Sequence, residues 1–265
     1  MRFCLAIFFK KTILILAKLI KRYNILSSIA ERSQMKYDRE LIRAKVIGRY
    51  NGVIIDANTE TGENVAVFCS ALDVVQMCTP NTTIYISKNI NQSRHVKWIL
   101  VFVEQEQSLI YACPNNNNDL FQEAFWAGLL PEFSEYTECR KLEAEDNLSH
   151  IDFELSKANG EKAYIFVTNV YHKIGDKAVF PMEVNFFELE MFEEMNQLQA
   201  AGHNTYAVMI VPRQDCSQMQ FSWKHSPLAA AKLFEEAKKG LKFIGYGCKI
   251  DKKSVSISQS IPILY

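Results

Sequence analysis

Ser149-His-Ile-Asp-Phe-Glu-Leu155 is the stretch that decides the fold of the second half of this chain. Its apolar residues alternate with polar ones, which predicts a strand with one face in the core and one polar face. Ala158-Asn-Gly160 predicts a turn, and Tyr164-Ile-Phe-Val-Thr-Asn-Val170 predicts a second strand. We therefore expect a β-hairpin that carries Asp152 on its polar face.

Asp152 is the residue of this hairpin that could carry chemistry. A carboxylate on the polar face of a central strand can hold a divalent cation, because hard cations take oxygen ligands. The alternative is an ordinary exposed aspartate with no ligand. The strand pattern alone leaves both interpretations open.

Helical and strand signals alternate around the hairpin. Helices are predicted at 119–128, at 183–201 and between Ser226 and Gly240, where Ser, Pro and Gly mark the two ends. Continuous apolar strands are predicted at 206–211 and 243–250. This order predicts a mixed sheet with helices packed on it.

The first half of the chain carries a different pattern. Short β-rich runs follow one another with turn residues between them and no clear helix; they cover residues 41–50, 52–57, 65–68, 82–87 and 96–103. Closely spaced strands of this kind predict a small barrel. The fold class expected is α+β, with an N-terminal extension at 1–34, an OB-like β-barrel at 35–114 and a restriction-endonuclease-like α/β domain with a mixed sheet at 115–265.

Composition limits the compartment and the partners. Lys plus Arg equals Asp plus Glu, at 30 each, so net charge predicts no partner and any nucleic-acid site must be local. The seven cysteines form no C-x-x-C pair, which favours reduced thiols in a cytoplasmic protein. The apolar runs between residues 3 and 22 are too short to span a membrane. A membrane-peripheral helix there, or a true start at Met35, stays open.

Three segments of the second half, namely the two strands of the predicted hairpin and residues 178–181, together resemble the sugar fermentation stimulation protein A family. That family has S-R-I-D-F, then Y-V-E-V-K-N/S-V, then A-x-F-P-D, where this chain has Ser149–Phe153, Tyr164–Val170 and Ala178–Pro181. Further similarity lies at Leu120–Glu132 and at Arg213-x-Asp215, where the family has Q-R-x-D.

The resemblance extends into the first half, through Leu41–Tyr50 and Ser93–Trp98, and covers about residues 36–262. It implies an OB-type barrel followed by a nuclease-like domain, and it implies DNA binding. The family begins near Met35 of this chain, which supports the second start.

The departures from the family pattern fall on the positions that catalysis needs. A nuclease of this type requires an Asp, then a Glu and a Lys on the next strand, to hold Mg²⁺ and to stabilise the phosphate charge. Asp152 is kept, but Phe166 stands at the Glu position and Thr168 at the Lys position. Glu183 lies one residue beyond the family's last Asp. We therefore expect no cofactor, and Mg²⁺ only if Asp152 and Glu183 retain a site.

Two basic clusters are the candidate nucleic-acid contacts. The first comprises Arg43, Lys45 and Arg49, and the second comprises Arg94 and Lys97 with Trp98. Cations that follow a phosphate backbone beside a stacking aromatic ring are typical of single-strand binding. Scattered solvated charges are the alternative.

The leading hypothesis is a non-catalytic protein that binds DNA or another nucleic acid, with no small-molecule cofactor. A Mg²⁺-dependent nuclease with relocated ligands, built from Asp152, Glu154 and Glu183, is an alternative. A protein-interaction or membrane-peripheral protein is the other.

Overall fold

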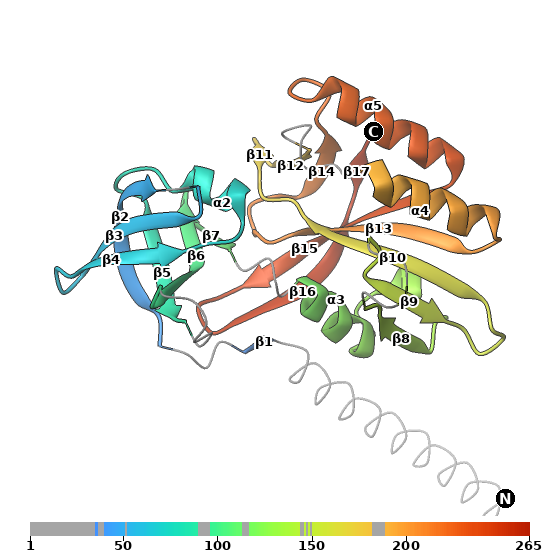
Figure 1. The fold of residues 1–265 in the computed structure, drawn as a ribbon, viewed down its shortest axis with the longest axis horizontal. Helices are drawn as coiled ribbons and strands as arrows, with labels where there is room; N and C mark the ends of the chain where they lie inside the picture. The colour runs from blue at the N-terminus through green and yellow to red at the C-terminus, as the bar shows by residue number, and fades with distance from the viewer. Residues whose placement is uncertain are drawn as a thin grey trace, which may run out of the picture.

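The computed structural model describes most of the chain, namely residues 35–36, 40–50, 52–89, 96–112, 117–143, 146, 148, 150–181 and 189–265. The expectations for residues 1–34, Arg94 and Glu183 fall outside the described residues. Two bodies are visible, a barrel on the left of Figure 1 and a larger sheet with helices on the right. The described residues therefore have the α+β organisation that the sequence predicts.

A closed barrel forms the first body. Its strands are β2 (Ile42–Tyr50), β3 (Ile54–Thr59), β4 (Asn64–Phe68), β5 (Thr83–Lys88) and β6 (Trp98–Gln105), and β7 (Ser108–Tyr111) extends the sheet beyond β6. The order is β4-β3-β2-β5-β6-β7, and a parallel pairing of β4 with β6 closes the barrel. Alternate residues of β2, β3 and β4 point inward and are buried, as the period-two pattern requires.

A short helix that the sequence pattern did not predict also contributes to the barrel core. It is α2 (Leu72–Met77), and its buried Val74 and Val75 belong to the apolar cluster that fills the barrel. Six residues are too few to show a helical period, so sequence periodicity could not have found it.

A seven-stranded sheet is the centre of the second body. Its order is β1-β16-β15-β13-β10-β9-β8, with β10, β13 and β15 parallel to one another and the outer pairs antiparallel. The bounds are β1 (Met35–Lys36), β8 (Glu138–Lys141), β9 (Phe153–Ser156), β10 (Lys162–Asn169), β13 (Asn204–Val211), β15 (Lys242–Ile250) and β16 (Ser254–Ile261). A second, smaller sheet joins β11 (Lys173–Ile174), β12 (Lys177–Phe180), β14 (Gln218–Phe221) and β17 (Ile263–Leu264).

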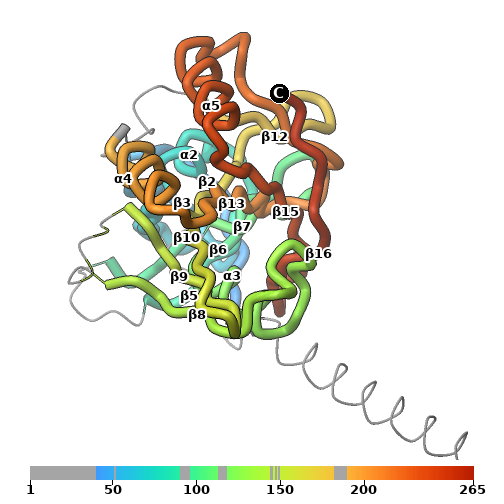
Figure 2. The backbone as a smooth tube through the Cα atoms, turned by 90° about the vertical axis from the view of Figure 1, so that its right-hand side faces the viewer, coloured from blue at the N-terminus to red at the C-terminus, as the bar shows by residue number. Residues whose placement is uncertain are grey.

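Helices cover both faces of the large sheet (Figures 1 and 2). α3 (Asn117–Trp126) packs Leu120 and Phe121 into one core cluster, and the 3-10 turn η2 (Pro131–Phe133) follows it. α4 (Leu189–Ala200) and α5 (Pro227–Lys239) contribute to a separate cluster on the other face. α5 begins at the predicted proline and ends before Gly240, whose φ of 118° suits glycine.

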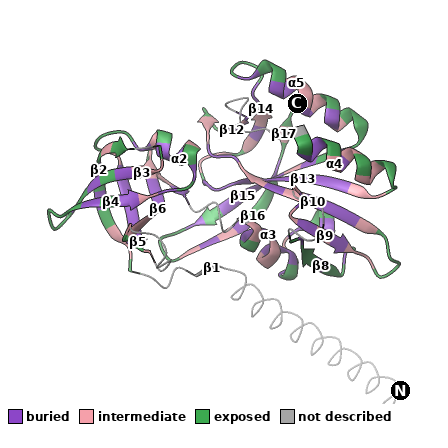
Figure 3. Cartoon of the chain, in the orientation of Figure 1, coloured by how far each residue is buried: buried purple, intermediate pink, exposed green. Residues whose placement is uncertain are grey.

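The barrel and the second body share one core, so the buried residues continue from one to the other (Figure 3). Phe102 and Tyr111 of the barrel belong to the same apolar cluster as Tyr246 and Val255 of the large sheet. The Tyr111 N–H also donates to the Pro212 carbonyl at 3.0 Å. The carboxyl ends of β10 and β13 therefore lead directly to the barrel.

None of the helices in the described part of the chain has the length and apolar character needed to cross a bilayer.

Candidate functional site

The Asp152 carboxylate is held by two protein donors. Oδ2 accepts the backbone N–H of Val167 at 2.7 Å, and Oδ1 accepts the side-chain amide of Asn118 at 2.8 Å. The ladder between β9 and β10 ends at the Phe153–Ile165 pair, so the carboxylate satisfies the next free N–H on that edge of β10. Asp152 thus joins β10 to the start of α3. This also explains why β9 begins at Phe153 rather than at His150, where the sequence predicted it.

Burial raises the pKa of the Asp152 carboxyl above its ordinary value, although the hydrogen bonds from Val167 and Asn118 work in the opposite direction. The positive charge of Lys141, on the adjacent strand β8, also acts to lower it. Asn118 and Lys141 are site residues that the sequence does not reveal. Asn118 belongs to a run of four asparagines at the start of the second predicted domain, and no spacing or motif pairs Lys141 with Asp152.

Phe166 and Thr168 lie in the second half of β10, at the positions of the family's Glu and Lys. Phe166 is partly buried and packs against the apolar cluster beneath α4. An aromatic ring cannot bind a hard cation, and a threonine carries no positive charge. Phe166 therefore packs in the core, and neither residue supplies the ligand or the charge that the family pattern has there.

The other polar residues of the hairpin are already engaged. Glu154 Oε2 accepts hydrogen bonds from Lys162 Nζ and from the Tyr164 hydroxyl, each at 3.0 Å. His150, at a family arginine position, lies with Nδ1 3.0 Å from Glu194 Oε1 and also donates its backbone N–H to that carboxylate. These contacts tie the hairpin to itself and to α4.

The residues described at this hairpin do not fit a Mg²⁺ site. Both Asp152 oxygens carry protein hydrogen bonds, Glu154 is paired with a cation, and the β10 positions lack ligands. Nowhere in the described residues do three or more His, Cys, Asp or Glu side chains form a group that could hold a metal ion. Glu183 lies outside those residues, so its role as a ligand stays a prediction.

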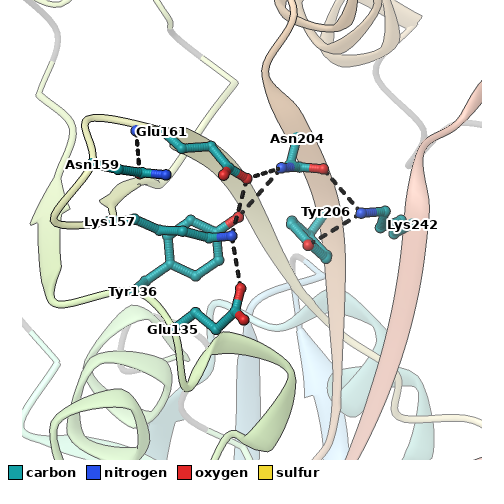
Figure 4. A network of polar contacts seen from close by, with 8 residues as sticks. All are labelled: Glu135, Tyr136, Lys157, Asn159, Glu161, Asn204, Tyr206 and Lys242. Atoms are coloured by element: carbon teal, nitrogen blue, oxygen red, sulfur yellow. Dashed lines mark hydrogen bonds and ion pairs between the residues drawn. The ribbon is translucent and has the colours of Figure 1, made fainter.

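A polar network links side chains of the hairpin loop to the amino ends of β13 and β15 (Figure 4). Asn204 Nδ2 donates to Glu161 Oε1 at 2.9 Å, and Lys242 Nζ donates to Asn204 Oδ1 at 3.0 Å. Lys157 bridges Glu161 and Glu135, at 3.1 and 2.7 Å. Ligands bind parallel sheets at the carboxyl ends of the strands, so this network at the opposite end stabilises the fold.

The first predicted basic cluster lies on the outer face of the barrel. Arg43, Lys45 and Arg49 are all exposed on β2. Arg43 Nη1 is 2.9 Å from Glu60 Oε1, and Lys45 Nζ donates to Thr83 Oγ1 at 2.8 Å. The structure thus places three exposed cations along one strand, of which Lys45 and Arg49 also donate to the carbonyls of Asn81 and Gln76.

The second predicted cluster lies on another wall of the barrel. Lys97 and Trp98 stand at the start of β6, which β5 separates from β2. Trp98 is half-buried and packs against the barrel core, so its ring contributes to closing the barrel. Arg94 is outside the described residues. The two clusters are therefore not brought together by the described part of the chain.

These features define a class of protein: a small closed barrel followed by a curled mixed sheet that carries few helices. The comparison with known families agrees. Residues 115–254 match the family described as "Sugar fermentation stimulation protein RE domain". The chain belongs to the sugar fermentation stimulation protein family.

Relatives of known name support this assignment over most of the chain. A sugar fermentation stimulation protein homolog from Maricaulis maris is 28% identical over 232 residues, covering 86% of this chain and 98% of the relative. A homolog from Agrobacterium fabrum is 25% identical over 230 residues, covering 86% and 96%. The solved structure of Pyrococcus furiosus SfsA in complex with Ca²⁺ has a TM-score of 0.75 and 15% identity, covering 87% of this chain and 100% of that chain. That likeness establishes the fold.

Proposed function

We propose that this protein binds nucleic acid through the outer face of β2 and does not cleave it. The observation that carries the proposal is a set of exposed cations on β2, with Arg43 and Lys45 before its bulge and Arg49 beyond it, beside exposed apolar side chains on the same strand. Ile47 is 50% exposed and Tyr50 is 61% exposed. Cations that follow a phosphate backbone, beside a ring on which bases stack, are the usual elements of single-strand binding.

A bulge in β2 supports this arrangement. The register between β2 and β3 shifts between Val46 and Gly48, and beyond it both Arg49 and Tyr50 are exposed. A bulge re-aims the side chains that follow it. Beyond the bulge, Arg49 pairs with the buried Ile55 and donates to the Gln76 carbonyl of α2 at 3.3 Å, whereas Tyr50 pairs with Ile54.

The ion pair that Arg43 already makes does not prevent it from binding phosphate. Both partners are exposed, at 45% for Arg43 and 64% for Glu60. Exposed pairs contribute about 0–1 kcal/mol, whereas releasing counterions from nucleic acid is a large driving force at low salt. Exchange of Glu60 for a phosphate is therefore favourable.

The absence of cleavage in this proposal rests on the hairpin. The Asp152 carboxylate is held by Val167 and Asn118, and the matched β10 positions are Phe166 and Thr168.

A cytoplasmic location forms part of the same proposal. It is supported by five free thiols in the described residues, four of them buried.

Fluorescence anisotropy of labelled single-stranded and double-stranded DNA, measured from low to high salt, tests the binding. The test variant replaces Arg43, Lys45 and Arg49 with glutamine. The matched control makes the same change in charge at Lys224, Lys238 and Lys249, which are exposed on the second body.

For single-stranded DNA, we expect the test variant to bind more weakly and to lose about 2 from the slope of log K against log salt, at about 0.7 per phosphate. The control should behave like the unmodified protein. Equal loss in both variants would refute the β2 site. No binding by the unmodified protein even at low salt would refute the proposed function and favour a protein-interaction role.

A further inference from the structure

A cavity of about 330 Å³ lies where the barrel meets the second body, and we name it the seam cavity. The barrel contributes Gln105 and Glu106 from the turn between β6 and β7. The second body contributes His172, Lys173 and Arg213, from the segments that follow β10 and β13. The cavity is therefore at the carboxyl ends of parallel strands, where open α/β sheets bind their ligands.

Arg213 forms the floor of the seam cavity as a buried cation. It is 1% exposed, its Nε and Nη2 donate to the two carboxylate oxygens of Asp215 at 2.6 and 2.8 Å, and Nη1 donates to the Tyr171 carbonyl at 2.6 Å. A guanidinium has five N–H groups, of which these bonds use three. Two remain without an acceptor among the described residues.

Lys173 places a second cation at the same cavity. Its Nζ is 2.8 Å from Asp215 Oδ2 and 2.7 Å from Glu106 Oε2. An ammonium group has three N–H groups, so one remains after these two contacts. The Lys173 side chain is 17% exposed, whereas that of Glu106 is 74% exposed. Of the two carboxylates on Lys173, Glu106 is therefore the one that water or a ligand can replace.

The turn that carries Glu106 is strained. Glu106 has φ 48° and Gln107 has φ 65°, in a region that favours glycine. Such strain persists where the surrounding structure holds it, and it gathers at functional sites. Here the contact with Lys173 helps to hold the turn against the second body.

We propose that the seam cavity binds the phosphate group of a small phosphate-bearing ligand, and that Glu106 is a built-in competitor occupying part of this site in the free protein. With Glu106 displaced, the cavity is lined by three residues that can still donate: Lys173, Arg213 with its two spare N–H groups, and Gln105 with its amide. Asp215 is then the carboxylate that remains on these two cations. A tetrahedral anion with several acceptor oxygens matches this surplus of donors.

Isothermal titration calorimetry with inorganic phosphate, adenosine monophosphate and an unphosphorylated oligonucleotide tests the proposal on the full chain. The decisive variant is Glu106→Gln, which removes the competing charge. Glu135→Gln is the matched control, because Glu135 is likewise an exposed carboxylate, at 76%, that lies 2.7 Å from one lysine, Lys157. Lys173→Met removes a donor, and a thermal melt checks that this variant is folded.

We expect Glu106→Gln to tighten phosphate binding about threefold to tenfold, because the Glu106 carboxylate no longer competes for Lys173. Glu135→Gln should leave it unchanged, and folded Lys173→Met should weaken it. Equal phosphate affinity in the unmodified protein and Glu106→Gln would overturn the proposal, as would no phosphate binding by either. Phosphate binding without oligonucleotide binding would support the seam cavity while refuting the proposed function, so the two fail separately.

Discussion

Replacing Asp152 with alanine should destabilise the protein without affecting any metal-dependent property. The change removes the acceptor of the Val167 N–H, a donor on a residue that is only 7% exposed, and of the Asn118 amide. A buried donor left unsatisfied costs about 1–3 kcal/mol, whereas water can reach the half-buried Asn118 at the helix start. Burial also makes the ionised Asp152 carboxylate costly in free energy, so removing this carboxylate recovers part of that cost. We expect a net loss of about 2 kcal/mol.

Asp152→Asn should cost less than Asp152→Ala. Its amide oxygen can still accept the Val167 N–H, and Asn118 can turn its own amide so that its oxygen accepts from the new NH₂ group. Urea unfolding followed by tryptophan fluorescence measures both variants. Asp56→Ala is the control, because Asp56 is an exposed carboxylate on β3, and it should change the stability by less than about 0.5 kcal/mol.

Two results would refute this account of Asp152. One is an Asp152→Ala protein as stable as the unmodified chain. The other is a rise in melting temperature with Ca²⁺ or Mn²⁺ that disappears in Asp152→Ala, since a ligand stabilises the folded state to which it binds.

Four further predictions concern stability. Tyr246→Phe removes the buried hydroxyl that donates to Glu132 and should cost about 2 kcal/mol in urea unfolding. Asn204→Ala removes the central amide of the network in Figure 4 and should cost about 1–2 kcal/mol in the same assay. Gln107→Gly relieves a positive φ and should increase the free energy of unfolding by up to about 1 kcal/mol, which a higher thermal midpoint would show. Burial would raise the pKa of Asp215, but its hydrogen bonds to two cations lower this pKa to about 2. The ionised carboxylate should therefore contribute about 1–2 kcal/mol to the free energy of unfolding, and this contribution should be lost as the pH falls from about 4 to 2. Asp215→Asn should not show that loss.

The parts of the fold that could be predicted from sequence are those with a local signal. The hairpin turn at Asn159-Gly160 and the helix between Pro227 and Gly240 carry their own turn and capping residues, and both are found where expected. The barrel followed from a run of short strands with turn residues between them. In each case neighbouring residues determine the element.

The parts that could not be predicted depend on contacts between distant segments. Asn118 bonds to Asp152 across 34 residues, and Arg213 lies in a cavity lined by a barrel turn roughly a hundred residues earlier in the chain. Neither pairing leaves a periodic or spaced pattern in the sequence. The sequence shows the Arg213-x-Asp215 motif, but not that Arg213 lines the seam cavity. That position depends on the contact between the end of β13 and the barrel.

Incubation of the purified full chain with single-stranded and double-stranded DNA, in the presence of Mg²⁺ or Mn²⁺ at low salt, tests the central claim most directly. The account predicts that DNA is bound, as a mobility shift shows, and recovered at full length. Cleavage that is abolished by Asp152→Ala, in a variant shown to be folded, would contradict it.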